Sequence, residues 1–263
     1  MRAPRFTVLH QDEQIIVIDK PAGLLVHPHP HAPDEPTCVG MLGKWLGSPV
    51  HPVHRLDRAT SGALLFATNS RTAHTLALQF QEGVVGKRYL AIVRGYVWGA
   101  TTLIRPIRRK LKGDERAPAE TGIRSLDRTE VPYPVGRYQT ARYSLVELNL
   151  VTGRPHQARK HMHHLAHPVV GDKRYGDKDH NTFFREHYGC EEMLLRSMYL
   201  SFRVEENEPL REIVAPIPEH WRDLAGRLGL EMPADYRPSP AEAFTEQSEQ
   251  DLGVIESADS TKL

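Results

Sequence analysis

Hydrophobic residues near the start of the chain occur in two short runs separated by a polar turn. Phe6–His10 and Ile15–Asp19 are rich in β-branched and other apolar side chains, and Gln11–Gln14 between them is polar. Two such runs with a short polar connection predict a β-hairpin. Lys20–Gly23 contains a proline and a glycine, which end the second strand.

A helix is predicted after Asn69. Asn69 and Ser70 offer a side-chain cap for the first turn, and Gly83 follows Arg71–Glu82 as a helix-ending glycine. We expect the helix to present three apolar side chains to a core, namely Leu76, Leu78 and Phe80.

The remaining periodic segments predict strands and helices without a regular βαβ alternation. Three runs are predicted as strands: Lys87–Val93, Tyr143–Leu150 and Leu194–Val204. Pro155–Leu165 predicts a helix with proline in its first turn, and His220–Leu228 a short helix before a glycine. This mixture favours an α+β fold with a mostly antiparallel sheet.

Three segments show no such pattern. Residues 27–36 contain four prolines and predict a loop. Residues 106–141 form a long polar stretch without a clear period, a length that is usually functional or mobile. Residues 231–263 are acidic and poor in large apolar side chains, so we expect a disordered, dispensable tail after a domain that spans residues 1–230.

Composition is ordinary for a globular protein. The 263 residues are 40% hydrophobic and 25% charged. The longest notable apolar run, Ala63–Ala67, is far shorter than the ~20 residues of a membrane span, and the first residues lack an apolar signal core. The two cysteines cannot form a disulfide framework or a cysteine zinc site. We therefore expect a soluble protein of the cytoplasm.

The net charge of +1 conceals an asymmetry between the tail and the body. Residues 231–263 carry a net charge of −6, and residues 1–230 carry +7. A basic body suits a polyanionic partner such as nucleic acid, because neutralisation of phosphates dominates such binding. A generic solvated surface would fit the same charges.

The densest polar cluster lies at His54–Gly62, before an apolar strand. Asp57 stands between Arg55 and Arg58, and neighbouring positive charge keeps a carboxylate ionised. An ionised aspartate can act as a nucleophile or as a general base. The alternative is a surface loop with solvated ion pairs.

A second basic cluster lies at Thr152–His161, at the start of a predicted helix. Arg154 and His156 would lie at its N-terminal end, where the helix dipole suits a phosphate or carboxylate. His156 and Lys160 would share one face. A solvated basic helix is the alternative.

Two groups of histidines raise the question of a metal site. Neither is accompanied by an H-E-x-x-H motif, and a zinc site needs three or four ligands. We therefore predict no metal at either group, the first being His27, His29 and His31 and the second His161, His163, His164 and His167.

Several motifs together resemble one family. His54–Ala67 (HRLDRATSGALLFA) closely resembles the H-R-L-D-x-x-T-S-G-x-L-L-x-A signature of RluA-type pseudouridine synthases. Four further segments agree in order, namely Asp19–Gly23, Lys87–Gly95, Thr152–His161 and His167–Asp172. The resemblance spans about residues 6–216 and implies the pseudouridine synthase fold: α+β, a mixed, mostly antiparallel sheet with flanking helices, and a central RNA-binding cleft.

The resemblance implies an isomerase that converts uridine in RNA to pseudouridine and needs no cofactor. By resemblance Asp57 is the catalytic aspartate, which leaves open whether it attacks C1′, attacks C6 or deprotonates C2′. Arg159 would pair with Asp57, and Tyr89 would stack on the base and assist loss of its C5 proton. We expect both to support catalysis without holding the fold. Arg55 would fill the gap left by the flipped base. The other expected substrate-binding residues are Arg58, Arg154, His156 and Gln157.

Within the family, the segments Val131–Gly153 and Tyr188-Gly189 resemble the branch that modifies tRNA at the base of the T-stem (tRNA position 65). The catalytic hairpin starts by Phe6, so we expect no N-terminal RNA-binding module and assign target recognition to the catalytic domain and a family-specific insertion at 106–141. Ala158 stands where relatives commonly have leucine. We expect a monomer that binds RNA. A ribosomal or dual-specificity enzyme and a non-catalytic RNA-binding protein are the alternatives.

Overall fold

The computed structural model describes residues 6–30, 33–108, 115–205 and 207–244. Its main feature is a ten-stranded sheet, with the order β1-β2-β4-β11-β5-β10-β9-β6, β3 paired to β4 and β12 to β11. The strands are β1 (Thr7–Gln11), β2 (Ile15–Lys20), β3 (His51–Pro52), β4 (Ser61–Ala67), β5 (Gly86–Arg94), β6 (Ala100–Ile104), β9 (Glu120–Val131), β10 (Ala141–Leu150), β11 (Leu195–Phe202) and β12 (Arg211–Val214). β7 (Ile107–Arg108) and β8 (Arg116–Ala117) form a separate small sheet.

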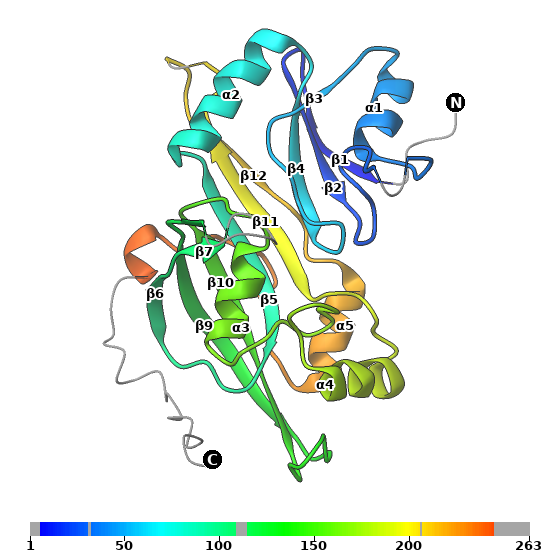
Figure 1. Ribbon diagram of the computed structural model, residues 1–263, viewed down its shortest axis with the longest axis vertical. Helices are drawn as coiled ribbons and strands as arrows, with labels where there is room; N and C mark the ends of the chain where they lie inside the picture. The colour runs from blue at the N-terminus through cyan, green and yellow to red at the C-terminus, as the bar shows by residue number, and fades with distance from the viewer. Residues whose placement is uncertain (1–5, 31–32, 109–114, 206, 245–263) are drawn as a thin grey trace.

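The sheet has two halves, each with its own helices (Figure 1). β1, β2 and β4 form one half beside α1, and β5, β10, β9 and β6 form the other, which α3 crosses. The helices are α1 (Cys38–Leu46), α2 (Ser70–Glu82), α3 (Gln157–His164), α4 (Lys178–Phe183) and α5 (Glu219–Leu228), with a π-helical turn at Phe184–Tyr188 and a 3₁₀ turn at Ala241–Phe244. Among the described residues, no helix has both the length and the apolar character needed to cross a bilayer.

The two halves meet where β4 pairs with β11, the parallel contact of an otherwise antiparallel sheet. The pairing includes only Ser61 with Arg196 and Gly62 with Ser197. Gly62 has φ 105, and a Cβ there would lie 2.1 Å from the carbonyl oxygen of Ser197. Only glycine permits this approach, which explains the last glycine of the HRLDRATSG segment.

The core lies on both faces of the sheet. On β10, Val146 and Leu148 contribute to the core on the α3 side, whereas Tyr143 and Leu145 contribute to the core that includes Trp221 of α5. Because both faces are covered, β10 needs no polar face. This explains why the strand has apolar residues on both faces and no regular alternation of apolar and polar positions.

Most predicted elements are confirmed. β1 and β2 pair antiparallel, with Thr7 opposite Asp19, as the hairpin prediction required. Asn69 caps α2 by accepting from the amide of Thr72 at 2.9 Å, and Gly83 ends it with φ 78. The predicted strands appear as β5, β10 and β11, and the predicted last helix as α5.

The expected inward face of α2 is wrong at one position. Leu76 is buried, but Leu78 is 41% exposed. Leu76 and Phe80 are four residues apart and share a face, whereas Leu78, two residues from each, lies on the opposite side of the helix.

The polar stretch 106–141 contains regular structure that the sequence pattern does not reveal. It holds β9, a twelve-residue strand between β10 and β6. Only Thr121–Ile123 and Val131 of β9 are buried, so the strand tolerates charged residues along most of its length. β9 and β10 extend together as a long hairpin beyond the body of the protein (Figure 1).

The expectation of a wholly disordered tail is wrong for residues 231–244. Tyr236 and Phe244 are buried, at 8% and 2% exposure. The Tyr236 hydroxyl and the Ser239 amide both donate to the carboxylate of Glu147 on β10. This segment therefore completes the core on the side of the sheet opposite α3; residues 245–263 lie outside the described residues.

Candidate active site

The loop that carries Asp57 is tied to the end of β2 by a buried lysine. The ammonium of Lys20 donates to the carbonyl oxygens of Leu24 at 2.8 Å and Arg58 at 3.0 Å. The amide of Gly23 also donates to the Arg58 carbonyl, at 2.8 Å. Burial lowers the pKa of Lys20 to about 8. The Asp19–Gly23 segment thus positions the residue that follows Asp57.

Arg159 bridges two carboxylates. Its Nη1 donates to Oδ2 of Asp57 at 2.8 Å, and its Nε and Nη2 grip both oxygens of Asp172 at 2.7 and 2.8 Å. The Asp172 side chain is completely buried. Burial raises the pKa of Asp172, but hydrogen bonds from Arg159 and two backbone amides outweigh this and lower it. Arg159 therefore has a structural partner as well as Asp57, which corrects the expectation that it takes no part in holding the fold.

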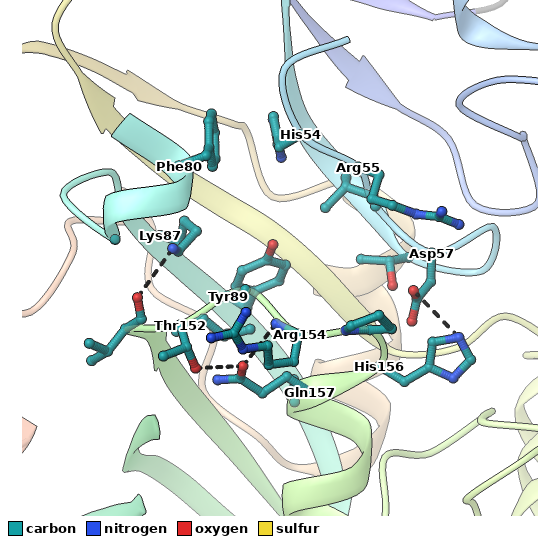
Figure 2. A pocket seen from close by; sticks show the side chains of 18 of the residues that line it. His54, Arg55, Asp57, Phe80, Lys87, Tyr89, Thr152, Arg154, His156 and Gln157 are labelled. Atoms are coloured by element: carbon teal, nitrogen blue, oxygen red, sulfur yellow. Dashed lines mark hydrogen bonds and ion pairs between the residues drawn. The ribbon is translucent and has the colours of Figure 1, made fainter. Parts of the chain in front are cut away.

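His156 faces Asp57 from the turn before α3, as Figure 2 shows. Its Nε2 lies 3.8 Å from Oδ1 of Asp57, and its Nδ1 is 3.1 Å from the Tyr175 hydroxyl. The residue has φ 58, a left-handed conformation, so α3 begins at Gln157 rather than at Pro155. Burial lowers the pKa of His156 although the charge of Asp57 raises it. A neutral imidazole therefore lies next to the carboxylate.

Tyr89 supplies an aromatic wall from β5. The residue is 8% exposed and its ring lines the pocket (Figure 2). Burial, helped by the negative charge of Asp57, raises the pKa of Tyr89 to about 12. The side chain is a neutral phenol at physiological pH and offers an apolar face for stacking.

These residues surround a pocket of about 600 Å³ between the Asp57 loop, β5, the end of α2 and the start of α3. The volume suits a nucleoside-sized ligand. Seven of the eight predicted site residues line it, namely Arg55, Asp57, Tyr89, Arg154, His156, Gln157 and Arg159.

Arg58 is the exception. Its Nε donates to the carbonyl oxygen of Gly23 at 2.9 Å, and its guanidinium pairs with Glu35 at 2.6 Å. It is absent from the pocket wall. Its position fits a loop-holding role outside the pocket, and the expected contact with substrate stays a prediction.

Gln157 lines the pocket, but its amide group is engaged by protein atoms. Its Oε1 accepts from the Thr152 hydroxyl at 2.7 Å and from the Arg154 amide at 3.0 Å, and its Nε2 donates to the Glu120 carbonyl at 2.8 Å. These bonds shape the turn that presents His156. Arg154 donates through Nε to a backbone carbonyl and keeps the rest of its guanidinium at the pocket.

His54 is a site residue whose role the sequence did not reveal. Its Nε2 accepts from the amide of Leu65 at 2.9 Å, and its ring stacks on Phe80 with centroids 4.5 Å apart. Burial lowers the pKa of His54 to about 3. The neutral ring joins the Asp57 loop to β4 and forms part of the pocket wall.

Lys20 and Asp172 also lay in recognised segments, but nothing in their spacing identifies their partners. Their local partners are backbone groups, whereas the contacts that tie them to the site, from Lys20 to the Arg58 carbonyl and from Asp172 to Arg159, depend on the fold. The available signal was only the presence of a lysine and an aspartate beside glycines in DKPAG and HPVVGD.

Several histidines near α3 serve as hydrogen-bonding side chains. His161 contacts Thr121 and the Arg105 carbonyl, and His167 contacts the Arg94 carbonyl. Within the described part of the chain, no group of three or more potential ligands could hold a metal ion. His31 lies outside the described residues.

Comparison with known proteins accounts for this fold and site together. Residues 14–164 match the model of the RNA pseudouridylate synthase family, and the chain belongs to that family. It is 41% identical to tRNA pseudouridine synthase C of Haemophilus influenzae, over 85% of this chain and 98% of the relative. The Vibrio cholerae protein of the same name is 38% identical, over 84% and 95% of the two chains.

Solved structures agree with this assignment. The structure of human RNA pseudouridylate synthase domain containing 4 superposes with a TM-score of 0.66 and 25% identity, covering 86% of this chain and 94% of that one. The α+β fold with a mostly antiparallel sheet is that of the pseudouridylate synthases, as predicted.

Proposed function

We propose that this chain isomerises a uridine of tRNA to pseudouridine, at the base of the T-stem. The observation that carries the proposal is the Asp57 carboxylate, held by Arg159 inside a pocket whose wall includes Tyr89. The substrate class is supported by relatives named tRNA pseudouridine synthase C that this chain matches over nearly their full length.

The reaction breaks the bond between N1 of uracil and C1′ of ribose and joins C5 to C1′ after the base has rotated. The proton lost from C5 is balanced by one gained at N1. The pocket must therefore hold a detached base beside the sugar and stabilise charge at C1′ or on the ring.

Asp57 is proposed as the reacting carboxylate. Arg159 donates to its Oδ2 at 2.8 Å, whereas the nearest side-chain atom that faces Oδ1, Nε2 of the neutral His156 ring, lies 3.8 Å away. Oδ1 is thus the oxygen available to attack carbon or to accept a proton. The Arg159 contact fixes the orientation of the carboxylate for either route.

Tyr89 is proposed as the stacking surface for uracil, and Arg55 as the residue that replaces it in the stem. Arg55 is exposed at the pocket (Figure 2). Extruding a base from a stem costs a few kcal/mol, which a side chain inserted into the gap can offset. We propose that the enzyme acts in the cytoplasm, where it meets tRNA, as a monomer.

The test is to incubate the purified protein with unmodified tRNA transcripts and map the product. Formation of pseudouridine at the base of the T-stem is expected. Helices of ribosomal RNA and isolated stem-loops serve as competitor substrates. Preferential modification of a fragment over intact tRNA would refute the assigned substrate, and no pseudouridine in any RNA would refute the activity.

A further inference from the structure

The pocket continues beyond Tyr89, on the side away from Asp57. Ser197 of β11 pairs with Gly62 of β4 on one side and with Tyr89 of β5 on the other. The Asp57 loop leads into β4 next to this row of paired residues. Lys87 lies two residues from Tyr89 in the opposite direction, on the same face of β5, and lines the same pocket.

Lys87 is buried yet poorly satisfied. It is 5% exposed, and its ammonium makes one long hydrogen bond, 3.4 Å to the carbonyl oxygen of Val151. An ammonium carries three donors. Among the described residues no ion pair joins a carboxylate to it, and Figure 2 shows it near Phe80, on the other side of Tyr89 from Asp57.

Lys20 shows what a structural lysine looks like in the same protein. It is equally enclosed, but its ammonium donates to three carbonyl oxygens at 2.8 to 3.0 Å. Burying a charged group without full compensation is costly. The Lys87 site thus lacks the partners that would justify a charge there for stability, and the residue lines a pocket large enough for a ligand.

We propose that the Lys87 ammonium binds a phosphodiester oxygen of the RNA strand next to the target nucleotide. This inference rests on the proposed function. A single anion can compensate this charge where the protein supplies only one carbonyl oxygen, and Arg55 and Arg154 add positive charge to a pocket wall that also holds the carboxylates of Asp57 and Glu82. Uracil is assigned to Tyr89, beside Asp57. Lys87 lies beyond Tyr89, where a flanking nucleotide would place its backbone.

The experiment compares Lys87→Met with a matched control, Lys44→Met. Lys44 is an exposed residue of α1 outside the pocket. Lys87→Met is expected to raise KM for tRNA about tenfold with kcat within about twofold, and to reduce the salt slope of binding by about one ion. Lys44→Met should leave both unchanged. The melting temperature of Lys87→Met should not fall, because methionine fills the same space without a buried charge.

A second experiment, on chemically modified RNA, identifies the ligand of Lys87. A methylphosphonate placed at the linkage flanking the target uridine removes the charge of that phosphate. This substitution should weaken RNA binding by the wild type about tenfold and leave RNA binding by Lys87→Met unchanged. The same substitution at a distant linkage should affect both proteins alike. A phosphate contact predicts this pattern, and a contact to a uracil carbonyl does not.

Other outcomes overturn the proposal. If kcat/KM falls but the salt dependence of binding does not change, Lys87 contacts an uncharged group of the RNA, such as the base. A lowered melting temperature with full activity of the folded fraction would make Lys87 structural. These results require active wild-type enzyme, so a failure of the proposed function is recognised separately, by wild-type protein that forms no pseudouridine.

Discussion

Arg159 and Asp57 are 102 residues apart in the chain, yet a hydrogen bond of 2.8 Å joins the guanidinium of one to the carboxylate of the other. The contact exists because α3 packs across the sheet while the Asp57 loop enters β4. Asp172 holds the guanidinium from its other side. Orientation of the carboxylate therefore depends on a buried ion pair outside the HRLD motif.

Asp57→Asn is expected to reduce turnover by ~10³-fold or more, about 4 kcal/mol of barrier, because the amide can neither attack carbon nor accept the proton. Binding of tRNA should remain nearly intact. Single-turnover formation of pseudouridine and equilibrium binding measure the two effects. Turnover within tenfold of the wild type would remove Asp57 from the mechanism.

Arg159→Met is expected to reduce both activity and stability. It leaves the fully buried Asp172 carboxylate without its cation, at a cost of about 3–5 kcal/mol. The second substitution Asp172→Asn should recover much of the stability, because an amide oxygen still accepts from the amides of Arg174 and Tyr175. Activity should not return. Urea unfolding and turnover on tRNA distinguish these effects, and a double variant as active as the wild type would contradict the catalytic part.

Stability should fall in acid partly through His54. Its pKa is about 3 in the folded protein against an ordinary value of 6.5, so the unfolded chain binds a proton at higher pH than the folded one. This contribution is complete above pH 6.5 and is lost as pH falls toward 3. Comparing urea unfolding at pH 7 and pH 4.5, His54→Gln should show a smaller loss than the wild type. His74→Gln, on the exposed side of α2, should match the wild type.

A chain that ends at Leu230 should be destabilised by several kcal/mol. It loses the burial of Tyr236 and Phe244, each worth about 1.5–3 kcal/mol, and the hydrogen bonds to Glu147. A chain that ends at Phe244 keeps all of these contacts and should unfold at the wild-type urea concentration. Equal stability of the two shortened chains would show that residues 231–244 contribute nothing to the fold.

Arg55→Ala should impair modification of folded tRNA more than modification of a short single-stranded RNA. In a single strand no base pair has to be opened, so no gap is left for a side chain to fill. The ratio of kcat/KM values for the two substrates measures this, with stability monitored by thermal melting. An equal loss on both substrates would instead indicate an ordinary phosphate contact.

The sequence permitted prediction of elements whose signals are local. Asn69 and Gly83 mark the ends of α2 because capping and left-handed glycine depend on neighbouring residues. The pattern failed at β9, where most residues are half-buried or exposed and several of them are charged. It also failed at Tyr236 and Phe244, two isolated apolar side chains in an acidic segment. Such residues are recognisable as core only once the surface they cover is known.

By itself, the sequence determined the family through the order of its motifs, and through the family the identity of Asp57, Tyr89 and Arg159 as candidates for chemistry. Only the tertiary structure decided which charged side chains form ion pairs with one another. Arg58 pairs with Glu35 outside the pocket, Arg159 bridges Asp57 and Asp172, and Lys87 remains without an anion. The reason is physical: electrostatic partners are chosen by distance and burial, and both arise only when distant segments pack against the same sheet.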